Sequence, residues 1–325
     1  MMVEVHNLNF EHKLLGLEPD NLLAFLALLG LLKALEYSQP ELSPRISWQG
    51  SPPTATLHLS KLLTRDDVVK IADSGLKVLG KFYDIMDKQP GTTDSPRCSR
   101  TCSAMPDNEF FSAEKFRKRA NYAYVDIEQG SLLAALASDV CLKSNSEQVE
   151  STPLRLIFGQ GHQHFPSRLK TVANSCSADG PKNLENTLFD EWKYNDKGES
   201  FRWDPNEDRR YAYQFGDPSM NKIGTMQGAN RLAAIGFSIL TSVPTGNGLA
   251  TLGFSCNSAN AEFSWPLPCV PTSLVGHIAL LSHPSLTERS KARELSAIGV
   301  LAISRTHRIQ VDRYFNFERA IVQFL

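Results

Sequence analysis

Hydrophobic and polar positions follow two distinct periods in the first part of the chain. Segments in which apolar and polar residues alternate indicate half-buried strands, whereas helically spaced or continuous apolar positions indicate helices. In chain order, the pattern predicts a strand, a helix, two strands around a Gly/Pro turn and a second helix, at residues 3–10, 20–37, 45–48, 54–59 and 64–86. We therefore expect residues 1–88 to form a β-α-β-β-α unit.

The first predicted helix contains a long apolar run at residues 22–32. This run is too short to cross a hydrocarbon core, which needs about 20 residues. Glu18 and Asp20 precede it, where a secretion signal would carry positive charge. Either Asp20 or Asn21 can cap the N-terminus of the helix. We therefore expect a buried helix and no contact with a membrane.

The chain changes character after residue 88. Residues 89–108 are rich in Pro, Gly, Ser, Thr and Cys, which predicts a loop or linker. In the C-terminal region, 109–325, the same patterns predict helices at 112–122, 129–142, 165–175, 182–194, 226–240, 274–281 and from 285 into the 290s. They predict strands at 154–158, 251–254, 261–265 and 308–315. The expected fold is α+β, with mixed helices and short antiparallel strands in one large domain or two closely packed domains.

Composition and charge narrow the classes of function. The chain has 34 Lys and Arg against 35 Asp and Glu in 325 residues, which gives a formal net charge of −1. Hydrophobic residues make up 42% and charged residues 21%, and these proportions exclude a disordered chain. The balanced charge also excludes a histone-like polycation, so any nucleic-acid site must be a local patch.

Cysteine and histidine spacing gives only weak support for a metal site. Cys98 and Cys102 are the only close pair among six cysteines, and a lone CxxxC lacks the second half of a structural zinc site. A loop with two free thiols fits better, in a reduced, cytoplasmic protein. His162 and His164 could share a metal ion on an extended strand, but no third ligand lies at a matching offset. We expect a strand-to-helix turn here and no cofactor, with a metal-dependent nuclease or phosphodiesterase as the alternative.

Arginines beside aromatic residues are the stronger functional signal. Guanidinium groups bind phosphates, and aromatic rings stack on bases. The candidate nucleic-acid-binding residues are Arg202, Trp203, Arg209, Arg210 and Arg231, together with Arg305 and Arg308 near the C-terminus. Segment 196–231 contains six basic and six acidic residues, so an internal salt-bridge network is an alternative of at least equal strength. The C-terminal arginines could equally belong to a protein interface.

Several short motifs occur in an order that resembles a known family. Among them are Arg-Trp-Asp-Pro at 202–205, Asp-Arg-Arg-Tyr-Ala at 208–212, Gly-Ala-Asn-Arg-Leu-Ala at 228–233 and Thr-Leu-Gly-Phe at 251–254. The others stand at 14–17, 21–32, 47–48, 158–160, 217–219, 225 and 265–266. Taken together, they resemble CRISPR-associated proteins of type I-G (formerly I-U) loci over about residues 14–281.

The resemblance implies a bacterial, cytoplasmic protein with a role in antiviral defence. It implies an accessory factor or subunit of a type I RNA-guided complex, in which base pairing reads most of the sequence and subunits contribute backbone contacts. The implied partners are guide RNA or target DNA and other CRISPR effector subunits. The resemblance provides no catalytic residues. Because the sequence also lacks a recognisable nucleophile or a complete metal set, we favour a binding protein over an enzyme.

Overall fold

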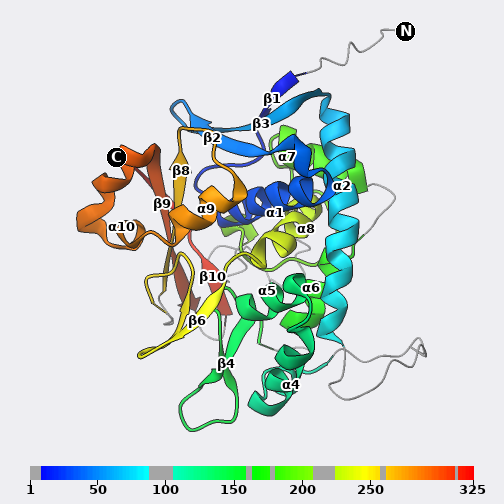
Figure 1. Ribbon diagram of the computed structural model, residues 1–325, viewed down its shortest axis with the longest axis vertical. Helices are drawn as coiled ribbons and strands as arrows, with labels where there is room; N and C mark the ends of the chain where they lie inside the picture. The colour runs from blue at the N-terminus through cyan, green and yellow to red at the C-terminus, as the bar shows by residue number, and fades with distance from the viewer. Residues whose placement is uncertain are drawn as a thin grey trace, which may run out of the picture.

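Helices and small antiparallel sheets share one fold (Figure 1), which is α+β as the sequence predicts. The computed structural model describes residues 9–87, 105–158, 163–175, 180–207, 224–256, 261–311 and 314–325. Within these ranges, no helix is long and apolar enough to cross a membrane.

The N-terminal β-α-β-β-α unit forms as predicted over the described residues. Its elements are β1 (Asn9–Leu14), α1 (Leu22–Ser38), η1 (Pro40–Leu42), β2 (Arg45–Gln49), β3 (Thr54–Leu63), α2 (Arg65–Lys81) and η2 (Phe82–Met86). The three strands pair antiparallel in the order β1-β3-β2. Most of the first predicted strand, residues 3–8, lies outside the described residues.

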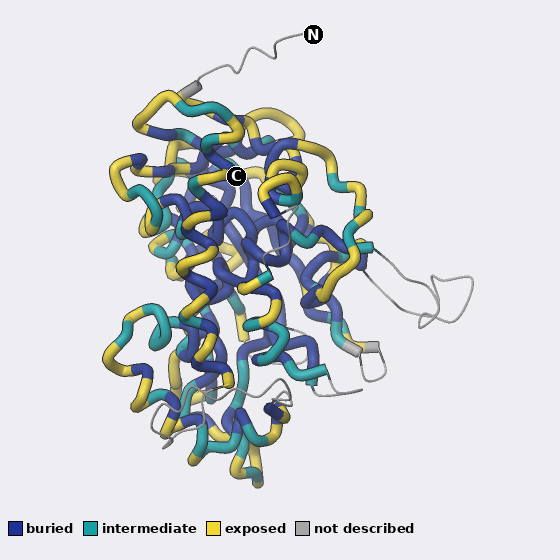
Figure 2. The backbone as a smooth tube through the Cα atoms, turned by 90° about the vertical axis from the view of Figure 1, so that its right-hand side faces the viewer, coloured by how far each residue is buried: buried dark blue, intermediate teal, exposed yellow. Residues whose placement is uncertain are grey.

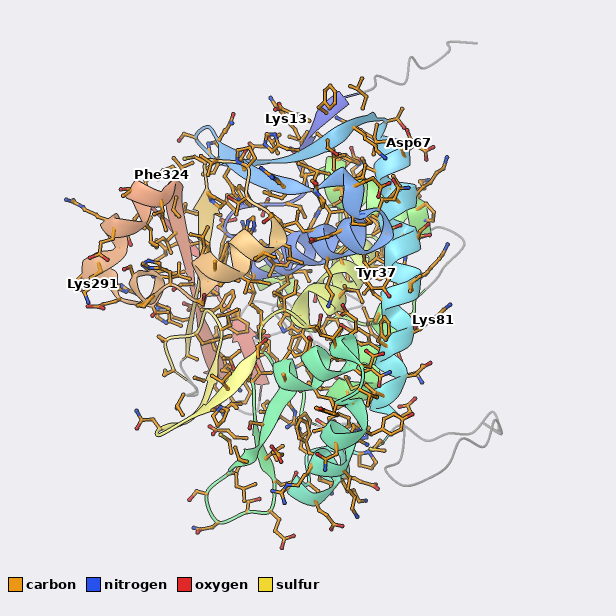
Figure 3. All side chains as sticks on the ribbon, in the orientation of Figure 1. Lys13, Tyr37, Asp67, Lys81, Lys291 and Phe324 are labelled. Carbon is orange, nitrogen blue, oxygen red and sulfur yellow. The ribbon has the colours of Figure 1, made fainter. Side chains whose placement is uncertain are left out.

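Local side-chain chemistry fixes where both helices of this unit begin. The Asn21 side chain accepts hydrogen bonds from the backbone N–H groups of Leu23 and Ala24, so Asn21 rather than Asp20 caps α1. Thr64 and Asp67 form a reciprocal capping box at the start of α2. Asp67 marks this upper end of α2 in Figure 3, and Lys81 points outward lower on the same helix.

Helix α1 lies near the centre of the molecule (Figure 1), most of its residues are buried, and buried residues gather in the interior of the fold (Figure 2). It crosses α8 (Gln227–Phe237) at a contact between two glycines. A Cβ atom on Gly30 would lie 1.9 Å from the carbonyl oxygen of Leu232, and one on Gly236 would lie 2.0 Å from that of Leu26. Only glycine permits such a close approach of two backbones.

One continuous hydrophobic core extends from Leu14 to Ala320. It therefore includes elements on both sides of the predicted linker at 89–108, such as α1 and α8. Residues 88–104 lie outside the described ranges, so the boundary itself stays a prediction. Packing across it agrees with one large domain or two closely packed domains.

The middle of the chain departs from two predictions. Its elements are α3 (Asp107–Phe110), α4 (Ala113–Ala123), α5 (Ile127–Leu136), β4 (Ala137–Leu142), β5 (Val149–Ser151), α6 (Phe165–Ala173) and α7 (Gly180–Phe189). The helix expected over 129–142 ends at Leu136, because residues 137–142 pair with β5 instead. The strand expected at 154–158 is an irregular segment, in which Leu154, Leu156 and Ile157 are buried by packing without a ladder of backbone hydrogen bonds.

A long strand organises the C-terminal part. The elements are η4 (Pro205–Glu207), α8, β6 (Ser242–Thr245), β7 (Gly248–Thr251), β8 (Glu262–Pro268), α9 (Leu274–Leu281), α10 (Pro284–Thr287), η6 (Arg289–Ile298), β9 (Val300–Val311), β10 (Tyr314–Phe317) and β11 (Ile321–Phe324). Strand β9 pairs antiparallel with β8, β10 and β11. The segment predicted as one strand at 308–315 therefore belongs to a hairpin. Strand β9 ends at Val311, and β10 runs back antiparallel beside it.

Candidate anion-binding site

The β9–β10 hairpin brings one predicted arginine into a cluster of cations and aromatic rings. We call Arg155, Phe158, Arg308 and Phe315 the cationic-aromatic cluster. The Arg308 guanidinium carbon lies 4.0 Å from the centre of the Phe315 ring and 5.9 Å from that of Phe158. The Arg155 guanidinium carbon lies 4.7 Å from the Phe158 ring centre, and the two ring centres are 5.4 Å apart. All four side chains therefore share one site.

Strand register explains how the C-terminal half of the cluster forms. Phe317 pairs with Arg308, and Phe315 pairs with Gln310. Residues opposite each other, and residues two apart on one strand, point to the same face of a sheet. Arg308 and Phe315 thus share a face of the hairpin. Their stacking is a cation–π contact, which holds a guanidinium in place without neutralising its charge.

Arg155 is fixed by a carboxylate from α3. Its Nη2 donates to Asp107 Oδ2 at 2.6 Å, and its Nε donates to the carbonyl oxygen of Ile157 at 3.3 Å. Its guanidinium also stacks on Phe111, 4.0 Å from the ring centre. The side chain is only 5% exposed. Arg155 is therefore a rigid positive neighbour for Arg308, with its own charge largely balanced by Asp107.

Arg308 lacks such a counter-charge among the described residues. It is 8% exposed, and its side chain makes no hydrogen bond or ion pair with them, although its backbone N–H donates to the carbonyl oxygen of Ala261. Its Nε is enclosed without a partner, whereas the two terminal nitrogens are not enclosed. Burial, together with repulsion from Arg155, lowers the pKa of Arg308 to about 10. The group is therefore still charged at neutral pH, with its outer N–H donors available.

Lys143 extends the positive field at the end of β4. Lys143 is exposed, and partial desolvation followed by repulsion from Arg155 lowers its pKa, while Glu150 and Asp107 act in the opposite direction. The cluster thus brings together two arginines and one lysine. The carboxylate of Asp107 is already hydrogen-bonded to Arg155. An incoming oxyanion would supply the missing negative charge, and guanidinium groups bind phosphates or carboxylates in this way.

The other predicted arginine segment has a structural role where it is described. Trp203 is fully buried, stacks on Phe201 with ring centres 4.3 Å apart, and donates from its indole nitrogen to the carbonyl oxygen of Leu154. Arg231 is 2% exposed and pairs with Asp73 of α2 at 2.5 Å. Trp203 therefore presents no face to a base. Arg231 forms an internal ion pair, as expected if the arginines of segment 196–231 belong to a salt-bridge network.

The remaining candidate arginines lie elsewhere. Arg305 is 6% exposed, and its Nη1 donates to Ser264 Oγ at 3.0 Å and to the carbonyl oxygen of Leu286 at 2.8 Å. It is three residues from Arg308 on β9, so it faces the opposite side of the strand. Arg202 is half-buried, with φ of +63°. Arg209 and Arg210 lie outside the described residues.

The described histidine of the metal hypothesis takes part in local structure. His164 Nδ1 accepts a hydrogen bond from the backbone N–H of Asp107 at 3.3 Å. The Asp107 carboxylate accepts one from the backbone N–H of Phe165, at the start of α6. Among the described residues, no three His, Cys, Asp or Glu side chains are grouped to hold a metal ion. His162, Cys98 and Cys102 lie outside the described ranges.

Sequence reasoning missed Arg155, Phe158, Asp107 and Lys143. A weak signal existed, because Phe158 directly precedes the Gly-Gln-Gly-His-Gln-His run at 159–164, Arg155 lies four residues before that run, and Phe158 begins one of the family-like motifs. Their contact with Arg308 joins positions about 150 residues apart, which no local pattern reveals. Comparisons with protein-family models, with curated proteins and with solved structures find no match.

Proposed function

We propose that the chain is a non-catalytic subunit or accessory factor of a type I CRISPR system, and that it binds nucleic-acid phosphates through the cationic-aromatic cluster. Arg308 is the observation that carries this proposal, because it is a desolvated, charged guanidinium with open terminal donors and no hydrogen-bond partner in the described part of the chain. The family resemblance supports the cellular role. Cytoplasmic location and contacts with other effector subunits are parts of the same proposal.

The chemistry of the cluster suits a phosphate. Stacking on Phe315 orients the Arg308 guanidinium in advance, so little side-chain entropy is lost on binding. Partial burial also strengthens the attraction between the guanidinium and an anion relative to bulk water. Phosphate contacts fix the position of nucleic acid without reading its sequence. This is what a subunit needs when a guide RNA supplies the specificity.

Binding assays over a salt series test the proposal. Labelled RNA and DNA are titrated with the purified chain between about 50 and 200 mM salt, where each phosphate contact should contribute to the slope of log K against log salt. We expect Arg308→Gln to lower affinity about tenfold and to make that slope shallower by roughly one unit. The matched control is Arg45→Gln, which removes one positive charge from an exposed position on β2.

Two results would overturn the proposal. One is the absence of salt-dependent binding of any nucleic acid at the lowest salt. The other is equal loss of affinity in Arg308→Gln and Arg45→Gln, because a general loss of positive charge would then explain the effect and the cluster would have no special role.

A further inference from the structure

The cations of the cluster are more buried than its aromatic rings. Arg155 and Arg308 are 5% and 8% exposed, whereas Phe158 and Phe315 are only half-buried. A ligand that reaches the Arg308 nitrogens therefore passes against phenylalanine carbon. The site combines a small charged base with an apolar rim, and this arrangement restricts the form of nucleic acid that fits.

Duplex and single-stranded nucleic acids present their phosphates differently. A duplex is stiff, with a persistence length of about 50 nm for DNA, and its bases are stacked and paired inside. Its phosphates cannot turn into a recess without bending the whole helix. A single strand can bend at each nucleotide, so one phosphate can enter while the neighbouring base stacks on an aromatic side chain.

We infer that the cationic-aromatic cluster binds single-stranded nucleic acid, with one phosphate at Arg308 and an adjacent unpaired base against the half-buried Phe315. This inference rests on the proposed function and names its substrate class. The number of charges supports the inference as well. One of the two guanidinium groups is already paired with Asp107, so the positive charge that remains suits one phosphate and not a long row of phosphates. The salt dependence is accordingly small, with a slope of about −0.7 for each phosphate of a single strand.

Competition binding tests the inference. A labelled single strand of about 15 nucleotides, within the range of known single-strand sites, is displaced by the same strand unlabelled, by its blunt duplex and by inorganic phosphate. We expect the single strand to compete at least tenfold better than the duplex. Inorganic phosphate should compete only at far higher concentration, because it supplies the anion without the stacking base.

Phe315→Leu separates stacking from charge. It keeps an apolar side chain beside Arg308 but removes the aromatic face, so the preference for single strand over duplex should fall roughly fivefold or more. Phe324→Leu on β11 is the matched control, because Phe324 is also a phenylalanine of the C-terminal sheet, is 51% exposed and lies at the rim of the molecule (Figure 3). The Phe324→Leu variant should keep the preference of the unmodified chain for single strand over duplex.

The outcomes distinguish the two proposals. If the unmodified chain binds no nucleic acid, the proposed function fails. If it binds nucleic acid in a salt-dependent way but the duplex competes as well as the single strand, the proposed function stands and the single-strand inference is overturned. An unchanged preference in a folded Phe315→Leu variant also overturns it. The measurement on the unmodified chain decides the matter even if this variant does not fold.

Discussion

A buried carboxyl group at the start of α1 gives the sharpest test of the electrostatics. Asp204 is 2% exposed, and its Oδ1 accepts hydrogen bonds from the Asn206 backbone N–H at 2.9 Å and from the Asn21 side chain at 3.2 Å. Burial, reinforced by the nearby negative charge of Glu207, raises the pKa of Asp204 to about 7. We therefore expect the substitution Asp204→Asn to change how the free energy of unfolding depends on pH.

The magnitude follows from the two pKa values of this carboxyl group. A rise from 3.8 to about 7 corresponds to roughly 4 kcal/mol, at about 1.36 kcal/mol for each pH unit. The folded state retains a proton that the unfolded chain releases above pH 3.8. The contribution of Asp204 is therefore fully present below about pH 4, falls as pH rises and is lost above about pH 7. Roughly 2.5 kcal/mol of it disappears between pH 5 and pH 8.

Urea unfolding at several pH values measures this contribution. The side-chain amide introduced by Asp204→Asn keeps an oxygen that can accept both hydrogen bonds but cannot ionise, so the variant should gain stability relative to the unmodified chain as pH rises from 5 to 8. Asp190→Asn, which makes the same replacement at an exposed position, serves as the matched control. Parallel pH profiles for the unmodified chain and Asp204→Asn would refute the reasoning.

Three further substitutions test other parts of the structure. Arg231→Ala removes the guanidinium partner of the buried Asp73 carboxylate but leaves its second cation, Lys77 at 2.6 Å, so it should cost roughly 1.5–3 kcal/mol in urea unfolding, and an unchanged midpoint would contradict the ion pair. Gly30→Ala places a Cβ atom 1.9 Å from a backbone carbonyl oxygen of α8, so it should lower the free energy of unfolding by about 3 kcal/mol or prevent folding. The control is Gly246→Ala, whose Cβ atom would have no other atom within 4 Å, and it should leave stability nearly unchanged. Arg308→Met removes a buried cation that has no counter-charge among the described residues, so it should raise the free energy of unfolding by roughly 1–3 kcal/mol while nucleic-acid binding weakens. Lower stability would argue for a structural role.

The N-terminal unit could be predicted because its signals are local. The apolar run and Asn21 define α1, and Thr64 with Asp67 defines the start of α2, without reference to any distant segment. Residues 137–142 show the opposite case. They continue an apolar helical pattern, but they become β4 because β5 offers a pairing partner, and such pairing overrides weak local preference.

The candidate site was only partly predictable for the same reason. The alternation around Arg308 indicated a strand, and the basic and aromatic residues at its end indicated a charged surface. The hairpin between β9 and β10, which places Phe315 on Arg308, could not be distinguished from one longer strand. Trp203 and Arg231 looked like binding residues because a single sequence does not reveal burial, and Asp73 lies 158 positions from Arg231.

The net charge of −1 conceals an uneven use of arginine. Five arginines of the described residues are at most 8% exposed, namely Arg119, Arg155, Arg231, Arg305 and Arg308. The first four donate hydrogen bonds to carbonyl, carboxylate or hydroxyl oxygens of the protein. Among these five described arginines, Arg308 is the one whose side chain donates none to the described residues, and the charge that lowers its pKa, that of Arg155, is also positive. A buried cation without a counter-charge destabilises the fold, so the lack of one among the described residues favours the proposed external anion over a purely structural role for Arg308. Under the proposed function, a nearly neutral protein binds phosphate at one local, desolvated site and avoids indiscriminate attraction to nucleic acid.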